Sequence, residues 1–325
     1  MSRWGVIAAV LVTACASDPP AISTSLVTEH QSGALLSAWG SSSSDVWTVG
    51  GGALVFHLKD GAWTPVDPQI TGIDLWWVFG FAGGDVFMSG SGGTILRYHG
   101  GAIEKMATPA ADGIIFGMWG PTADDVWAVG RAGAQGAILW HYDGTTWTTV
   151  APPSELPPGA IAFKVHGQRS DDVWVACSGG GTLHWDGSAF TYSEIGDPAS
   201  LFGIVTIPGT AIASGDVTQL GAGALFENRG SGWQAASLQA PVAWRGLGAG
   251  ANQVYAVGEE GLLAQRDDNG AWTLIKQTLT QQSFHAVWVD PDGGMWGVGG
   301  EFGSTPTRDG FLMYRGTSDV PALSP

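Results

Sequence analysis

The 325-residue chain is poor in charge, in basic side chains and in cysteine. Charged residues make up 13% of it, and 13 Lys and Arg stand against 29 Asp and Glu, for a formal net charge of −16. Nucleic-acid binding needs a basic surface for the phosphates, so the composition argues against a nucleic-acid partner. Hydrophobic residues reach 44%, which excludes a disordered chain and fits a globular one.

The sequence also lacks a hydrophobic run long enough to span a bilayer as a helix. One short run, Trp4–Val12, follows Arg3 and has the length of a signal-peptide core. It ends in Val12-Thr13-Ala14-Cys15, which resembles the bacterial lipobox. The resemblance implies a lipoprotein signal peptide over residues 1–14, lipid attachment at Cys15, and a tether over residues 15–21. The alternative is an ordinary secretory signal with an incidental cysteine.

A lipid anchor implies a place in the cell envelope with the membrane as one partner. No Asp directly follows Cys15, which favours the outer membrane, with the protein facing the periplasm or the surface. Cys177 is the one other cysteine. Because it lies in the apolar run Val173–Cys177, we expect a buried hydrophobic residue and not a reactive thiol.

Glycine and tryptophan are abundant, with 51 Gly and 17 Trp, and both recur at a regular spacing. The clearest unit contains Asp125-Val126-Trp127 followed by Gly130, and degraded copies recur about every 40 residues. The Asp position falls in turn at Asp45, Asp85, Asp125, Asp172, Thr210, Gln253 and Gly294. Two residues later stand Trp47, Phe87, Trp127, Trp174, Ile212, Tyr255 and Trp296.

Each unit contains four short apolar runs separated by turn residues, the pattern of β-strands. In the third unit the runs are 114–120, 126–130, 137–142 and 146–150, and Asp143-Gly144 suits a tight hairpin between the last two. A helical solenoid would contain less Gly and Trp, and a β-solenoid would have shorter repeats. The sequence predicts an all-β fold, a seven-bladed β-propeller of four-stranded antiparallel blades over residues 22–316.

The last unit has three strand-like runs and no fourth before the C-terminal tail, residues 317–325. Ile22–Thr28 is the one strand-like segment outside the repeats. We expect it to pair onto the last blade as its outermost strand and so to close the ring.

The repeated residues are best explained by the architecture. The Asp suits an Asx turn, and the aromatic ring fills the space between neighbouring blades. His141 and His184 occupy one repeat position, which indicates blade packing or a surface place. Five Trp lie outside the repeated positions and remain open to a binding role, namely Trp76, Trp77, Trp140, Trp185 and Trp244.

The turn Asp143-Gly144-Thr145-Thr146-Trp147 resembles the Asp box of BNR-type propellers, although it is one residue shorter between Asp and Gly. The resemblance spans about residues 34–316 and is to sialidase-like and photosystem-assembly-factor-type propellers. Tectonin-type lectin propellers look similar as well. It implies the architecture and carries no activity over.

Motifs of enzyme chemistry are missing. The Phe-Arg-Ile-Pro motif of sialidases, a zinc-binding His-Glu-x-x-His and a phosphate loop are absent from the sequence, which has only five Tyr. Asp290-Pro291-Asp292-Gly293 has too few acidic residues for a calcium loop and is read as a turn. We therefore expect no catalytic residues, no cofactor and no metal.

In an up-and-down blade, the turns between the second and third strands share one face with the connections between blades. This face, called the loop face below, has turns of variable length, whereas the opposite hairpin face is nearly uniform. Variable loops on a rigid scaffold favour binding. The candidate binding residues are Arg131, Gln135, Asp216, Glu259, Glu260, Glu301 and Arg308.

Three hypotheses of function follow. The first is a non-catalytic, lipid-anchored propeller that binds a protein or an envelope polymer. The second is a carbohydrate-binding lectin, which exposed Trp side chains would support. The third is a sialidase-like glycoside hydrolase, which needs paired carboxylates in the central pocket.

Overall fold

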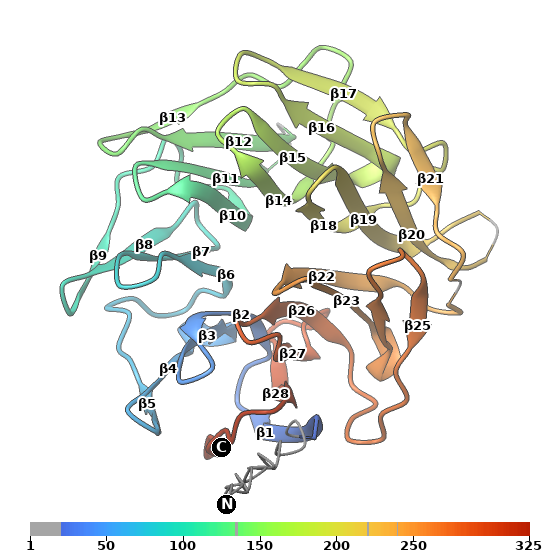
Figure 1. The fold of residues 1–325 in the computed structure, drawn as a ribbon. Helices are drawn as coiled ribbons and strands as arrows, with labels where there is room; N and C mark the ends of the chain where they lie inside the picture. The colour runs from blue at the N-terminus through green and yellow to red at the C-terminus, as the bar shows by residue number, and fades with distance from the viewer. Residues whose placement is uncertain (1–20, 134–135, 220, 239) are drawn as a thin grey trace, which may run out of the picture.

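The computed structural model describes residues 21–133, 136–219, 221–238 and 240–325. Within them, 28 strands form seven four-stranded antiparallel sheets, which stand as blades around a central axis (Figure 1). The predicted seven-bladed propeller is confirmed. Among these residues, no helix is long and apolar enough to cross a membrane.

Each of the first six blades is a run of consecutive strands, with the first strand innermost. Blades 1 to 3 consist of β2 (Leu35–Ser42), β3 (Asp45–Gly50), β4 (Val55–Lys59), β5 (Ala62–Pro65); β6 (Leu75–Gly80), β7 (Val86–Gly90), β8 (Ile95–His99), β9 (Ala102–Lys105); and β10 (Ile114–Thr122), β11 (Asp125–Arg131), β12 (Ala137–Tyr142), β13 (Trp147–Thr149). Blades 4 to 6 consist of β14 (Ala162–Arg169), β15 (Asp172–Cys177), β16 (Gly181–Trp185), β17 (Phe190–Glu194); β18 (Leu201–Ile207), β19 (Thr210–Val217), β20 (Gly223–Asn228), β21 (Trp233–Ala235); and β22 (Trp244–Gly250), β23 (Gln253–Gly258), β24 (Leu263–Arg266), β25 (Trp272–Leu274). Single 3₁₀ turns follow the second strand in three blades, at η1 (Gly51–Ala53), η2 (Ser178–Gly180) and η3 (Glu259–Gly261).

The seventh blade joins the two ends of the chain. Its order is β26 (Phe284–Val289), β27 (Met295–Glu301), β28 (Arg308–Gly316) and then β1 (Ser23–Gln31). β1 pairs antiparallel with β28 and is the outermost strand, so the predicted closure is confirmed.

The tail after β28 seals the same junction. The Leu323 amide donates to the Val27 carbonyl at 2.9 Å, and Trp63 Nε1, in blade 1, donates to the Pro321 carbonyl at 3.0 Å. Leu323 is buried in the core cluster that joins blades 7 and 1. The tail therefore holds the first and last blades together.

The hydrophobic core is divided into seven clusters, one between each pair of neighbouring blades. The repeated aromatic position supplies their centres, since Trp47, Trp127 and Trp296 are at most 2% exposed. The expectation that these rings fill the spaces between blades is confirmed. Cys177 is also fully buried, and burial raises the pKa of its thiol to about 12.

The Asx-turn interpretation of the repeated Asp is wrong for blades 1 to 4, where the carboxylate binds a side chain of the third strand; in blade 2 Asp85 binds Arg97 and His99. In blade 1, Asp45 Oδ1 lies 2.7 Å from Nε2 of His57, and the His57 ring stacks on Trp47 with centroids 3.8 Å apart. The register of β3 and β4 sets Trp47 opposite His57, so the ring nitrogen reaches the carboxylate at the start of β3. His141 and His184 make the same contacts with Asp125 and Asp172, which gives both histidines a structural role.

Asx turns occur instead in the outer hairpins. Asp143 Oδ1 accepts the amides of Thr145 and Thr146. In blade 4 the Asp186 carboxylate accepts the Ser188 hydroxyl and the amides of Ser188 and Ala189, and these bonds lower its pKa to about 2. The inner hairpin of blade 7, between β26 and β27, also has such a turn, because Asp290 Oδ1 accepts the amides of Asp292 and Gly294.

Candidate functional site: the central channel

The seven innermost strands surround a central cavity of about 170 Å³. Its wall takes residues from β2, β6, β10, β14, β18, β22 and β26, so every blade contributes. Aromatic side chains dominate one side, with Trp39, Trp77, Phe79, Trp119 and Trp288. Of the described residues, no Asp or Glu lines this cavity.

A pairing of Trp with Gly shapes this wall. Trp39 lies on Gly80 of the next blade, where a Cβ would come within 2.7 Å of the ring. Trp119 lies in the same way on Gly167, at 2.6 Å. The glycines thus let neighbouring inner strands approach closely and hold the rings at the channel wall.

A β-bulge interrupts each inner strand near the loop face. The residues at the bulge are Leu36, Trp76, Phe116, Phe163, Phe202, Arg245 and His285. Bulges re-aim a side chain and often stand beside functional sites. Here they build a collar around the loop-face end of the channel.

The collar side chains touch in sequence around the axis. Centroids are 5.3 Å apart for Trp76 and Phe116, 5.7 Å for Phe116 and Phe163, and 5.2 Å for Phe163 and Phe202. The Arg245 guanidinium carbon then lies 4.3 Å from the Phe202 ring centroid. These collar side chains are half-buried, so they combine rings and one guanidinium at a surface accessible to a partner.

Lys164 lies beneath the collar and lines the cavity. It is 7% exposed, its Nζ donates to the Phe116 carbonyl at 2.6 Å, and Nζ lies 4.1 Å from the Trp77 ring centroid. Burial lowers the pKa of this amine from 10.5 to about 7. No ion pair to a carboxylate is found for it among the described residues.

Two further basic groups surround the same end of the channel. The pKa of His285 falls to about 3, because burial and the nearby charges of Lys164 and Arg245 oppose protonation. Its Nδ1 lies 2.5 Å from the Leu36 carbonyl, so the neutral ring donates there. Arg245 is paired with Glu259, with Nε 3.0 Å from Oε1. This end of the channel thus holds three basic side chains, of which His285 is neutral and Arg245 is neutralised by Glu259.

The structure gathers some of the predicted loop-face residues and leaves others apart. Glu259 joins the collar through Arg245, and Glu301 pairs with Arg308 at 2.5 Å. Phe302 directly follows Glu301 in the sequence, and its ring centroid lies 5.1 Å from that of the collar residue His285. Glu260 is exposed in η3, with a left-handed φ of 54°.

Arg131 ends β11, and Asp216 accepts the Val217 amide at the end of β19. No ion pair between described residues joins either of them to the collar. Gln135 and Cys15 lie outside the described residues. The binding role of the loop-face residues remains a prediction.

The hairpin face has a groove that the sequence analysis did not anticipate. It has a volume of about 590 Å³, lies across blades 4 to 6, and includes Gln168, Asn252 and Asp267. It shares His166 and Ala249 with the channel cavity, so the two hollows adjoin. The cavity therefore adjoins a groove on the hairpin face.

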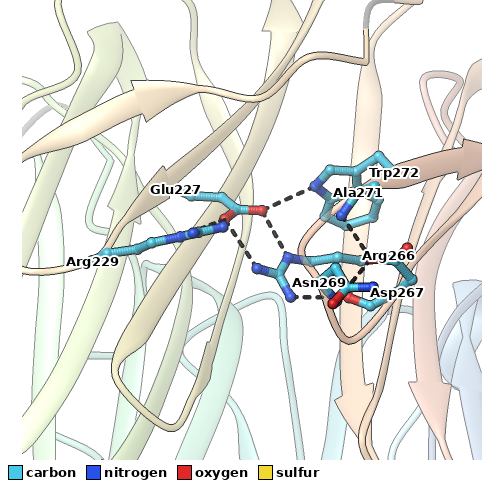
Figure 2. Close-up of polar contacts among 7 residues, drawn as sticks. All are labelled: Glu227, Arg229, Arg266, Asp267, Asn269, Ala271 and Trp272. Carbon is cyan, nitrogen blue, oxygen red and sulfur yellow. Dashed lines mark hydrogen bonds and ion pairs between the residues drawn. The ribbon is translucent and has the colours of Figure 1, made fainter.

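One buried polar cluster is structural. Glu227 of β20 accepts Nε of Arg266 at 2.8 Å, NH2 of Arg229 at 2.8 Å and the Trp272 indole at 3.1 Å (Figure 2). Burial alone would raise the pKa of Glu227, but the hydrogen bonds from Arg266 and Arg229 hold it below its usual value. The cluster joins blades 5 and 6, and each of Arg229, Arg266 and Trp272 donates a hydrogen bond to Glu227. Among the described residues, no group of three His, Cys, Asp or Glu side chains is arranged to hold a metal ion.

The five Trp outside the repeated positions divide into two groups. Trp140 and Trp244 are at most 2% exposed, and Trp185 packs on Trp127 with centroids 5.1 Å apart. Trp77 lines the channel cavity, and Trp76 belongs to the collar. No Trp in the described part of the chain is among the exposed large hydrophobic residues.

Sequence reasoning missed Lys164 and the bulge positions. A signal for Lys164 was present, because it stands inside the apolar run Ala162–Val165. Aligning the first strands of the seven units shows a lysine where most units have a small residue. The bulges could not be predicted, because the strand assignment assumed strict alternation of inward and outward side chains.

Solved structures similar to this chain are propellers of diverse function. A virginiamycin B lyase from Staphylococcus aureus is 13% identical with a TM-score of 0.73, and the match covers 90% of this chain and 99% of the lyase. YCF48 bound to a D1 peptide is 15% identical with a TM-score of 0.66, over 94% of this chain and 99% of YCF48. The WD40 repeats of RRP9 are 10% identical with a TM-score of 0.70, over 91% and 97% of the two chains.

No protein-family model and no curated protein matches the sequence. At these identities the structural matches show the fold alone. They agree with the propeller resemblance drawn from the repeats. The lipobox and Asp-box resemblances remain predictions.

Proposed function

We propose that this protein is a non-catalytic propeller that binds a protein partner on its loop face. The observation that carries the proposal is the collar, where half-buried rings stand beside the Arg245–Glu259 pair. Rings and arginine are the side chains most often responsible for affinity in protein interfaces. An extended segment with one apolar side chain and flanking charges fits such a surface.

The comparisons support binding in general. One similar propeller is YCF48 with a D1 peptide bound, and another is formed by WD40 repeats. Because one similar fold is that of a lyase, the fold alone does not exclude catalysis, and the side chains of the cavity have to be considered. For a glycoside hydrolase the chemistry requires paired carboxylates, and the described lining of the channel cavity contains none.

The lectin hypothesis has weaker support than protein binding. Sugar rings stack on accessible indole faces, whereas the described Trp side chains are buried or half-buried. An envelope polysaccharide remains the alternative ligand. A glycan array with reproducible hits would favour it.

We also propose that Cys15 is lipid-modified and holds the propeller at the bacterial cell envelope, most simply at the outer membrane. β1 is the outermost strand of blade 7 and runs from the hairpin face toward the loop face. A tether before Ser23 would thus attach at the rim on the hairpin side. This arrangement leaves the loop face directed away from the membrane and open to a partner.

A pull-down from native envelope tests both parts. Glu260→Lys and Glu301→Lys change exposed loop-face charges, and Asp124→Lys makes the matched change on the hairpin face. We expect the loop-face variants to recover at least tenfold less of a co-purifying protein than the wild type, and Asp124→Lys to recover as much. Equal recovery by all three variants contradicts the loop-face assignment.

The anchor is tested separately with Cys15→Ala. We expect this variant to leave the membrane fraction while the folded propeller retains its partner in solution. A variant that stays membrane-bound shows that the lipid assignment is wrong.

A further inference from the structure

Lys164 departs from the repeat at a position that the fold defines. It directly follows the bulge of its inner strand, and the equivalent positions hold Ser37, Trp77, Gly117, Lys164, Gly203, Gly246 and Ala286. Only blades 2 and 4 place a long side chain there, and the two meet in the cavity lining. Gly117 of blade 3 lies between them and packs closely on the Lys164 backbone, where a Cβ would come 3.1 Å from Lys164 Cα.

The Lys164 amine has fewer hydrogen-bond partners than a protonated amine requires. An ammonium has three N–H donors, and Lys164 Nζ has one carbonyl and one ring face. A buried charge without an opposite charge is strongly unfavourable. Glu259, the acid at this end of the channel, is already occupied by Arg245.

A second orphan donor lies in the collar, next to the cavity lining. Trp76 Nε1 is buried and has no hydrogen-bond partner within the described structure. Its ring contacts both Phe116, whose carbonyl binds Lys164, and His285, whose pKa responds to the charge of Lys164. Unpaired buried donors in native proteins call for an explanation, and this one lies beside the partners of Lys164.

We propose that the channel cavity binds a carboxylate carried on an apolar body, with Lys164 Nζ as its counter-ion. A single negative charge matches one ammonium, and the rings of Trp39, Trp119 and Trp288 suit an aromatic or aliphatic body. The cavity volume of about 170 Å³ is similar to that of cavities of about 150 Å³ that accommodate benzene. A benzoate-sized ligand is therefore the appropriate probe.

Entry to this site is from the hairpin face, past His166 and Ala249, which belong to both the cavity and the groove. The site goes beyond the loop-face function proposed above and does not depend on it. The loop-face substitutions leave Lys164 in place, so the two proposals fail separately.

Calorimetry and tryptophan fluorescence at pH 6 test the site with benzoate as the probe. Benzamide is the neutral isostere, inorganic phosphate tests for general anion binding, and Lys164→Met removes the counter-ion. Lys276→Met is the matched control, because Lys276 is exposed in the segment after β25, the outermost strand of blade 6. Thermal unfolding of each variant verifies that it folds.

We expect benzoate to bind the wild type and Lys276→Met equally, and to bind Lys164→Met at least tenfold more weakly. Benzamide should bind at least tenfold more weakly than benzoate. The proposal is overturned if benzoate does not bind, if benzamide or phosphate binds as well, or if Lys164→Met retains full affinity.

The source of the carboxylate is distinguished by a further pair of probes. N-acetylphenylalanine carries the carboxylate of a peptide end, and its C-terminal amide does not. Tighter binding of N-acetylphenylalanine than of benzoate indicates a peptide terminus, and the reverse order indicates a small free acid.

Discussion

Replacing Lys164 by Met should make the protein more stable at neutral and acidic pH. Burial lowers the pKa of this amine from 10.5 to about 7, so folding disfavours its protonated form. Each pKa unit corresponds to about 1.4 kcal/mol, and the folded state therefore loses about 5 kcal/mol of stability below pH 7. Met is similar in length and has no charge to desolvate.

The substitution also has a cost. It leaves the Phe116 carbonyl without the Lys164 donor, and an unpaired buried acceptor costs about 1–3 kcal/mol. The net gain below pH 7 should therefore be about 2–4 kcal/mol. Few single substitutions stabilise a protein by this much.

The pH dependence has a definite sign. Between pH 7 and 10.5 the unfolded chain binds a proton at Lys164 that the folded protein has released, so the stability of the wild type rises with pH across this window. The penalty is complete below pH 7 and absent above 10.5. The advantage of Lys164→Met should accordingly disappear, or reverse by about 1–2 kcal/mol, by pH 10.

Urea unfolding at pH 6, 7.5 and 10, followed by tryptophan fluorescence, measures these differences. Lys276→Met is the control and should match the wild type at every pH. A Lys164→Met protein that is less stable at pH 6, or a difference that does not change with pH, would refute the reasoning. Either result would mean that the ammonium is compensated within the fold.

Three further predictions concern the scaffold. Gly80→Ala should destabilise the protein by about 1–3 kcal/mol in urea unfolding, because the new Cβ meets the Trp39 ring at 2.7 Å; an unchanged midpoint contradicts the Trp–Gly packing. Glu227→Gln should cost about 3–5 kcal/mol by the same assay, because it leaves the buried Arg266 without its counter-charge, and a loss below 1 kcal/mol would count against a buried ion pair. NMR titration should give Asp186 a pKa of about 2, so its hydrogen bonds favour the fold above the unfolded-state pKa and are lost as pH falls toward 2; a value near 3.8 shows that the turn does not form in solution.

The blades and their closure could be predicted from sequence because the information is local and repeated. Strand alternation, turn residues and a regular period identify each blade, and the missing strand of the last unit leaves Ile22–Thr28 as its only complement. The prediction failed where the partner of a side chain comes from another strand. Asp45 suits an Asx turn by its neighbours alone, yet the register of β3 and β4 gives it His57 instead.

The channel is harder to predict for a related reason. Its wall takes one short segment from each of seven inner strands, which lie about 40 residues apart in the chain. A bulge also shifts the alternation on every one of those strands, so a period of two assigns the following residues to the wrong face. Neither effect is visible in a single unit.

In a repeat protein, a departure from the repeat has to be judged by its surroundings. Cys177 breaks the glycine position of its unit, but it is fully buried in an apolar cluster that it helps to fill, so packing explains it. Lys164 breaks its own position where Gly117 and the cavity could have left room for an apolar side chain, and its charge is unfavourable there. A residue whose net effect destabilises the free protein is explained by a ligand that requires its charge. The stability of Lys164→Met and its affinity for benzoate should therefore change in opposite directions, a combination that a purely structural lysine would not give.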